Sequence, residues 1–172
     1  MSIILLLLRL PILVVHILVG LFTILFFPKE QKNFKSTHYR IMMLWMNILS
    51  SILGIKVDIR GVPDQSANLF VSNHVTYLDI IIINKLLPVN FIAKEEISSW
   101  PIIGRLASKT GTLFIKRGDN VESSKMIYEM EERFKLQNKI VFFPEGKIGN
   151  GKRVRKFHYK LFKSIENKEL YI

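Results

Sequence analysis

The first 27 residues are almost wholly apolar, and this run restricts the possible fold more than any other part of the sequence. Within residues 10–27 it is interrupted only by His16 and Thr23. At a helical rise of about 1.5 Å per residue, it is long enough to cross, or nearly cross, a hydrocarbon core of roughly 30 Å. A cleaved signal peptide is the alternative interpretation, but no small-residue cleavage site follows. We therefore expect a retained N-terminal membrane helix.

Basic residues follow the apolar run and predict the orientation of the chain. Only one acid, Glu30, lies among Lys29, Lys32, Lys35 and Arg40. By the positive-inside rule, this flank and the rest of the chain face the cytoplasm. The formal net charge of +11 favours an anionic partner, which is a membrane surface, a phosphorylated substrate or nucleic acid. We expect a protein of the inner, cytoplasmic membrane.

A second apolar stretch, residues 41–55, is too short to span a bilayer comfortably. It contains Trp45 and has basic residues at both ends, which is typical of an interfacial or re-entrant helix lying on the first one. An ordinary core helix is the alternative, and the pattern does not distinguish one spanning helix from a re-entrant pair. We assign residues 1–55 to an N-terminal membrane-associated helical segment and residues 56–172 to a separate domain.

Beyond residue 55, short apolar segments alternate with helical patterns. Strands are predicted at residues 56–60, 69–71, 90–93, 111–115 and 140–143, and helices at residues 77–87, 97–107 and 119–136. The helix at residues 97–107 is expected to be short and interrupted, because it contains Pro101 and Gly104. This alternation predicts an α/β domain with a mixed, largely parallel sheet flanked by helices.

Polar residues follow four of the predicted strands. They are Asn73 and His74, Lys94 and Glu95, Lys116 and Arg117, and Glu145 and Gly146. In open α/β sheets the functional groups collect beyond the carboxyl ends of the strands. We therefore expect these residues to meet along one edge of the sheet.

His74 and Asp79 form the pair with the clearest chemistry. On an ideal helix, residues five apart differ by about 140° around the axis, so these side chains meet only if His74 precedes the helix. Thr76 and Asp79 have the capping-box pattern, which places the helix start just after the histidine. Asp79 is then either a helix cap alone, or the acceptor that orients the imidazole so that its other nitrogen takes a proton from a substrate hydroxyl.

Four blocks of the sequence resemble, in the same order, those of the glycerolipid acyltransferases, above all the 1-acyl-glycerol-3-phosphate (lysophosphatidic acid) acyltransferases. His74 and Asp79 match the family's motif of histidine, four-residue spacer and aspartate. The other blocks are Lys94-Glu95 with Pro101 and Gly104, residues 111–117, and Phe143-Pro144-Glu145-Gly146. The resemblance covers residues 41–162, and the shared order of the four blocks makes it specific.

The resemblance implies transfer of an acyl group from acyl-ACP or acyl-CoA to the free hydroxyl of 1-acyl-glycerol-3-phosphate, which gives phosphatidic acid. Another lysolipid acceptor is the alternative. His74 would act as general base with Asp79 as its orienting partner, and no covalent acyl-enzyme is expected. The thioester is a co-substrate, and no cofactor is implied.

The same resemblance implies four substrate-binding residues. Arg117, with Lys116 beside it, would hold the phosphate of the acceptor, since a guanidinium binds phosphate bidentately. Glu145 would position the acceptor, and backbone amides near Gly146 are candidate donors to the oxyanion. The alternatives are a solvated cation at the strand end and a carboxylate that serves only a turn.

The sequence departs from the family pattern after Gly146. Lys147 and Ile148 stand where threonine and then arginine or a small polar residue are usual. Family members normally continue past the position of Ile172 with strands that complete the sheet, so the C-terminal part of the domain is expected to be missing. An incomplete sheet leaves an exposed edge. A catalytically impaired remnant that binds membrane is therefore the alternative to an active enzyme.

Seven basic residues and no acid lie within residues 147–163. This segment suits an anionic bilayer or the acidic surface of a carrier protein, and a solvated loop is the alternative. Nucleic-acid binding is not expected, because it needs aromatic residues interleaved with surface cations. A metal site is not expected either, because the chain has no cysteine and its four histidines are scattered.

Overall fold

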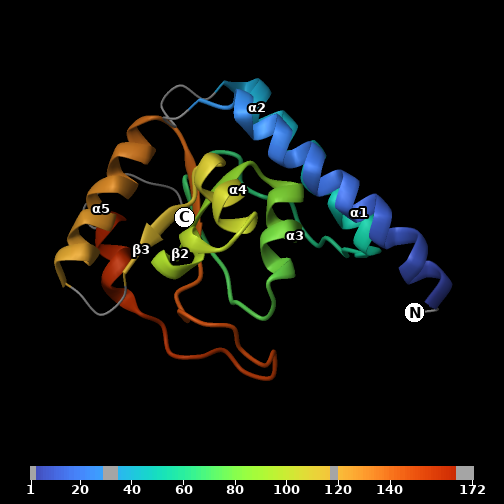
Figure 1. The fold of residues 1–172 in the computed structure, drawn as a ribbon. Coiled ribbons are helices and arrows are strands. Elements are labelled where there is room, and N and C mark those ends of the chain that lie inside the picture. Colours follow the sequence, from blue (N-terminus) through green and yellow to red (C-terminus); the bar gives the residue numbers. More distant parts are fainter. Residues whose placement is uncertain (1–2, 29–34, 117–119, 166–172) are drawn as a thin grey trace.

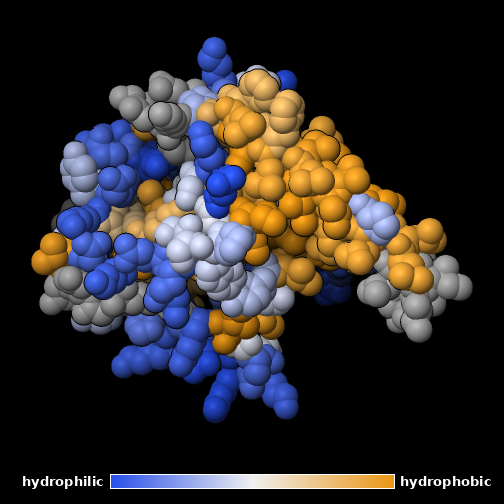
Figure 2. Space-filling model, viewed as in Figure 1, coloured by the Kyte–Doolittle hydropathy of each residue, from blue (hydrophilic) through white to orange (hydrophobic). Residues whose placement is uncertain are grey.

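The structure of the chain is a computed structural model, and it describes residues 3–28, 35–116 and 120–165 (Figure 1). Two long N-terminal helices lie along one side of an α/β domain (Figure 1). Apolar residues gather over these two helices, whereas hydrophilic residues cover the opposite and lower parts of the same view (Figure 2). The molecule therefore presents one apolar side and one polar side.

The apolar N-terminal run forms a single long helix, α1 (Ile3–Thr23), which continues into a 3-10 turn, η1 (Ile24–Phe26). Between Leu7 and Phe26 it is long and apolar enough to cross a membrane, and no other helix in the described part of the chain is. Many of its large apolar side chains are more than half exposed, as they would be in a helix that faces lipid. The predicted long apolar N-terminal helix is confirmed.

The second helix, α2 (Ser36–Leu53), packs antiparallel to α1. The Arg9 guanidinium, near the start of α1, lies against Gly54, the left-handed residue that ends α2. Further along α1, the His16 ring stacks on the Trp45 indole. As predicted, α2 lies on the first helix, and it also packs against the α/β domain.

The α/β domain is built on β1 (Leu69–Val71), β2 (Val89–Lys94), β3 (Leu113–Ile115) and β4 (Lys139–Phe142). The strands pair in parallel in the order β1-β4-β2-β3. These four strands and the largely parallel sheet were predicted and are confirmed. The prediction of a strand at residues 56–60 is wrong, because this segment pairs with no strand among the described residues. Alternating residues give a strand only where a partner takes up the backbone hydrogen bonds.

Helices cover both faces of the sheet (Figure 1). On one face, α5 (Asn120–Lys135) and η4 (Tyr159–Ile165) pack on β1, β3 and β4. On the other face, α3 (Leu78–Leu86) packs on β2 and β4, and α2 packs on α3. The predicted helix at residues 119–136 is confirmed by α5, whose Met126, Met130 and Phe134 side chains are buried in the core.

The Pro101 and Gly104 block forms a tight connection between two short helices, η3 (Glu95–Ser99) and α4 (Ile103–Lys109). A Cβ atom added to Gly104 would lie 2.2 Å from the carbonyl oxygen of Ser98, so only glycine lets the two helices approach this closely. The predicted short, interrupted helix is confirmed.

Candidate active site

The loop between β1 and α3 carries the histidine and the aspartate. His74 Nδ1 lies 2.8 Å from Asp79 Oδ2. Because the helix begins at Leu78, His74 precedes it, and the two side chains meet in the way that helix geometry requires. An ionised carboxylate only accepts hydrogen bonds, so Nδ1 carries the proton and Nε2 is left as the basic nitrogen.

The Asp79 carboxylate also organises the backbone of the loop. The Val75 and Thr76 amides donate hydrogen bonds to Asp79 Oδ2, at 2.8 and 3.0 Å. The Thr76 bond is half of the predicted capping box. Asp79 therefore caps the helix and contacts the imidazole at the same time, so it is not a cap alone, and its part in proton transfer stays a prediction.

Aromatic rings fix the plane of the imidazole. The His74 ring stacks on Phe143 with centroids 4.0 Å apart and an angle of 14° between the planes, and the edge of Tyr77 faces it at 6.5 Å. Phe143 follows β4, which pairs with β1, so the sheet brings two distant sequence blocks together. Phe143 belonged to a recognised block, but nothing in the sequence predicted that its ring would support the histidine.

Glu145 is 4% exposed and joins two loops at the site. Its Oε1 accepts a hydrogen bond from the His74 amide at 3.1 Å, and its Oε2 accepts one from the Arg155 amide at 2.9 Å. The Gly149 amide adds a 2.6 Å hydrogen bond to the His74 carbonyl. These contacts give Glu145 the role of a positioning residue for His74, and its contact with the acceptor stays a prediction.

Gly146 adopts a left-handed conformation, with φ of 71°, that favours glycine. Its amide donates a 3.0 Å hydrogen bond to the Phe143 carbonyl, which closes the turn after β4. This amide is therefore already used within the protein. The prediction that other backbone amides near Gly146 donate to the oxyanion stays a prediction.

Lys116 and Arg117 were predicted to hold the phosphate, and the sheet order sets where they lie. Lys116 is exposed and follows β3, on the same carboxyl edge as His74. Two strands separate β3 from β1, and at about 4.8 Å per strand this corresponds to roughly 14 Å across the sheet. Arg117 lies outside the described residues. Phosphate binding by this pair stays a prediction.

A histidine held by a carboxylate at the carboxyl edge of a parallel α/β sheet has the geometry that a general base toward a hydroxyl requires. The family model described as "Acyltransferase" matches residues 55–172, which is more than half of the chain. The chain belongs to the acyltransferase family.

Two curated relatives illustrate this membership. The chain is 35% identical to the lyso-ornithine lipid O-acyltransferase of Pseudomonas aeruginosa, over 73% of this chain and 48% of that protein. It is 31% identical to the 1-acyl-sn-glycerol-3-phosphate acyltransferase of Neisseria gonorrhoeae, over 76% of this chain and 51% of that protein. The chain thus spans about half the length of these relatives.

The fold is similar to that of the 1-acyl-sn-glycerophosphate (LPA) acyltransferase PlsC from Thermotoga maritima, whose crystal structure is known. The TM-score is 0.60 at 19% identity, and the match covers 77% of this chain and 54% of that chain. This likeness supports the parallel sheet with its flanking helices. It says nothing about the substrate.

Proposed function

We propose that the chain transfers an acyl group from a thioester to the free hydroxyl of a lysolipid, with His74 as the general base. The observation that carries the proposal is the 2.8 Å contact between His74 Nδ1 and Asp79 Oδ2, in a ring plane fixed by Phe143. This arrangement leaves Nε2 as the basic nitrogen, which a hydroxyl acceptor needs.

In the reaction, Nε2 of His74 takes the hydroxyl proton while the oxygen attacks the carbonyl carbon of the thioester. The carbon–oxygen bond forms, the tetrahedral oxyanion collapses, and the carbon–sulfur bond breaks. The imidazolium returns the proton to the departing thiolate, so the thiol leaves neutral. Asp79 stabilises the imidazolium between these two steps. The thioester is already activated, so no cofactor is needed beyond the acyl-ACP or acyl-CoA co-substrate.

Lysophosphatidic acid is the first acceptor that we propose, and a lyso-ornithine lipid is the second. Relatives of both names match the chain at about 30% identity or more. The two acceptors differ in what Lys116 and Arg117 would contact, because only lysophosphatidic acid offers them a phosphate. Neutralising these two cations should therefore weaken use of lysophosphatidic acid more than use of the lyso-ornithine lipid.

The reaction would take place at the cytoplasmic face of the inner membrane. α1 supplies a helix with the length of a span, and basic residues follow it in the sequence. By the positive-inside rule these residues support a cytoplasmic α/β domain, on the side where acyl-ACP and acyl-CoA are found. The basic residues within 147–163 are mostly exposed and suit the acidic surface of a carrier protein or an anionic bilayer.

The test is an acylation assay with membranes that contain the full chain. Each acceptor is paired with acyl-ACP and with acyl-CoA, and the native chain is compared with His74→Ala. Product that depends on His74 supports the proposal, and the preferred pair identifies the substrates. Equal background product from both chains would overturn it and favour a protein that binds membrane without turnover.

A further inference from the structure

The turn between η3 and α4 holds large apolar side chains out of the domain. Trp100, Ile102 and Ile103 are 41%, 46% and 53% exposed. Ile102 has a φ of 65°, which is unfavourable for a β-branched residue, and the Ile103 amide donates a 2.6 Å hydrogen bond to the Pro101 carbonyl. The close packing at Gly104 keeps this turn in place. Strained turns with exposed apolar residues are typical of sites that contact a partner.

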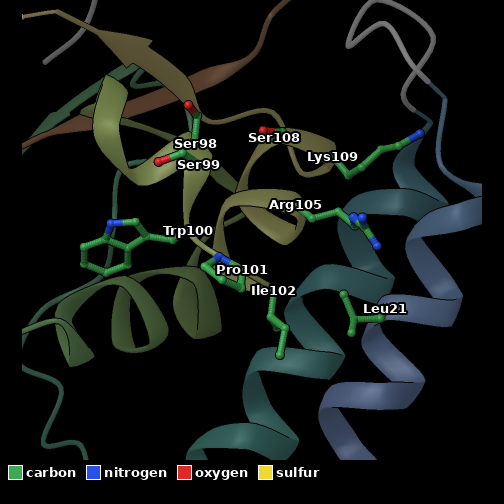
Figure 3. Close-up of a pocket in the computed structure, with 9 residues that line it drawn as sticks. All are labelled: Leu21, Ser98, Ser99, Trp100, Pro101, Ile102, Arg105, Ser108 and Lys109. Carbon is green, nitrogen blue, oxygen red and sulfur yellow. The ribbon is translucent and has the colours of Figure 1, made fainter.

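A cavity of about 790 Å³ lies between this turn and the N-terminal helices (Figure 3). The turn contributes Ile102, which points toward the N-terminal helices, and Leu21 of α1 projects from the opposite side (Figure 3). Trp100 also lines the cavity, but its indole points away from Leu21 (Figure 3). The Arg105 and Lys109 side chains extend from α4 toward α1 and α2 (Figure 3). The cavity therefore combines apolar walls with two cations.

These two cations are available to a ligand. Among the described residues, neither Arg105 nor Lys109 forms an ion pair with a carboxylate. The nearby hydroxyls of Ser98 and Ser99 already donate to the carbonyls of Glu95 and Glu96. An anionic group is thus the natural partner of the polar side of the cavity. The apolar walls require that this group be attached to hydrocarbon.

The depth of the cavity relative to α1 fits a bilayer interface. Leu21 lies five residues before Phe26, where the apolar span ends, which corresponds to about 7.5 Å along the helix. Interfacial elements are buried by about 5–10 Å at the boundary between headgroups and acyl chains. Tryptophan is enriched at this level, where one side of its ring is apolar and the other is wet.

We propose that this cavity binds an anionic phospholipid of the bilayer and docks the α/β domain on the membrane surface. Arg105 and Lys109 contact the headgroup phosphate, the acyl chains lie against Leu21 and Ile102, and the exposed Trp100 indole enters the bilayer beside them. Trp100 lies 6.3 Å from Tyr77, and Tyr77 lies 6.5 Å from His74, measured between ring centroids. Docking of this turn places the His74 site beside the lipid surface.

The test uses Trp100 as its own probe, because the chain has only two tryptophans. The full chain is reconstituted into phosphatidylcholine vesicles that contain either brominated phosphatidylglycerol or brominated phosphatidylcholine. The fluorescence of Trp100 is obtained by subtracting the signal of the Trp100→Phe variant. We expect brominated phosphatidylglycerol to quench Trp100 more strongly than brominated phosphatidylcholine at the same mole fraction.

A double substitution then tests the cations. The double variant Arg105→Gln with Lys109→Gln should abolish the preference for phosphatidylglycerol. Each cation is expected to contribute a factor of about five to this preference. The matched control, Lys125→Gln with Lys135→Gln on α5, changes the net charge equally and should keep it. The readout needs no turnover, so it is independent of the acyl-transfer proposal.

Three results would overturn the inference. Trp100 fluorescence that neither brominated lipid quenches would show that the turn does not reach the bilayer. An unchanged preference in the Arg105→Gln and Lys109→Gln variant would show that the cations bind no headgroup. Loss of the quenching when lysophosphatidic acid is added would show that the cavity is the acceptor site instead.

Discussion

Two histidines, one in each part of the molecule, are packed alike and bonded differently. His16 stacks on Trp45 with centroids 4.5 Å apart and 16° between the planes, and His74 stacks on Phe143 at 4.0 Å and 14°. His16 Nε2 lies 3.1 Å from the Trp45 carbonyl, and the Trp45 indole donates to the His16 carbonyl at 3.2 Å. His74 faces the Asp79 carboxylate. Stacking therefore sets only the ring plane, and the hydrogen-bond partner distinguishes an imidazole that joins two helices from one that is proposed to act as a base.

The largest effect should come from replacing each histidine in turn. His74→Gln keeps a polar side chain but removes the base, so turnover should fall by about 10²–10⁴-fold, the usual contribution of general base catalysis. His16→Gln should leave turnover close to that of the native chain. The measurement is the initial rate of lysolipid acylation in membranes with matched amounts of each protein. Equal losses in the two variants would mean that both histidines are structural.

The next effect concerns the carboxylate that distinguishes the two histidines. Asp79→Asn keeps a group that accepts hydrogen bonds but removes the charge that stabilises the imidazolium, so turnover should fall by about 10²-fold. Asp64→Asn is the matched control, because Asp64 is an exposed turn carboxylate bonded to Ser66. Single-turnover rates separate this loss from weaker acceptor binding. Full turnover in Asp79→Asn would show that Asp79 serves only as a helix cap.

A smaller effect is expected at Glu145, whose carboxylate accepts a hydrogen bond from the His74 backbone amide. The backbone of His16 is held within its own helix pair, through the bond from the Trp45 indole to its carbonyl. In Glu145→Gln, the side-chain NH₂ group replaces one carboxylate oxygen and cannot accept a hydrogen bond. One of the two buried backbone amides, that of His74 or that of Arg155, therefore loses its acceptor. This should lower the free energy of unfolding by about 1–3 kcal/mol. Thermal unfolding in detergent measures it, with the exposed Glu129→Gln as control. A native-like midpoint with slow turnover would assign Glu145 to the substrate instead.

The smallest effect is expected in the helix pair. His16→Phe keeps the stacking on Trp45 but loses the hydrogen bond to its carbonyl, so stability should fall by about 1 kcal/mol. Turnover should not change. Unfolding of the detergent-solubilised chain, followed by the fluorescence of Trp45, checks the first part. A loss of turnover as large as that of the His74 variant would show that the helix pair contributes directly to the site.

Local patterns predicted most of the elements and the histidine pair. The strands at residues 69–71 and 140–143 could be predicted because they are short apolar runs with polar ends. The Asp79 cap could be predicted because its hydrogen bonds join residues that are close in the sequence. The arrangement of side chains around the His74 imidazole could not be predicted from the sequence. Phe143 and Glu145 reach His74 only because β1 pairs with β4, and no local pattern specifies which strands become neighbours. The failure at residues 56–60 has the same cause, since alternation does not show whether a partner exists.

The order of the strands has a consequence for how the protein matures. β1 and β4 are neighbours in the sheet but are the first and last of the four strands along the chain. The loop closure between β1 and β4 spans most of the domain, and contacts of such long range form slowly. The contacts that Phe143 and Glu145 make with His74 depend on this pairing, so they are expected to form late in folding.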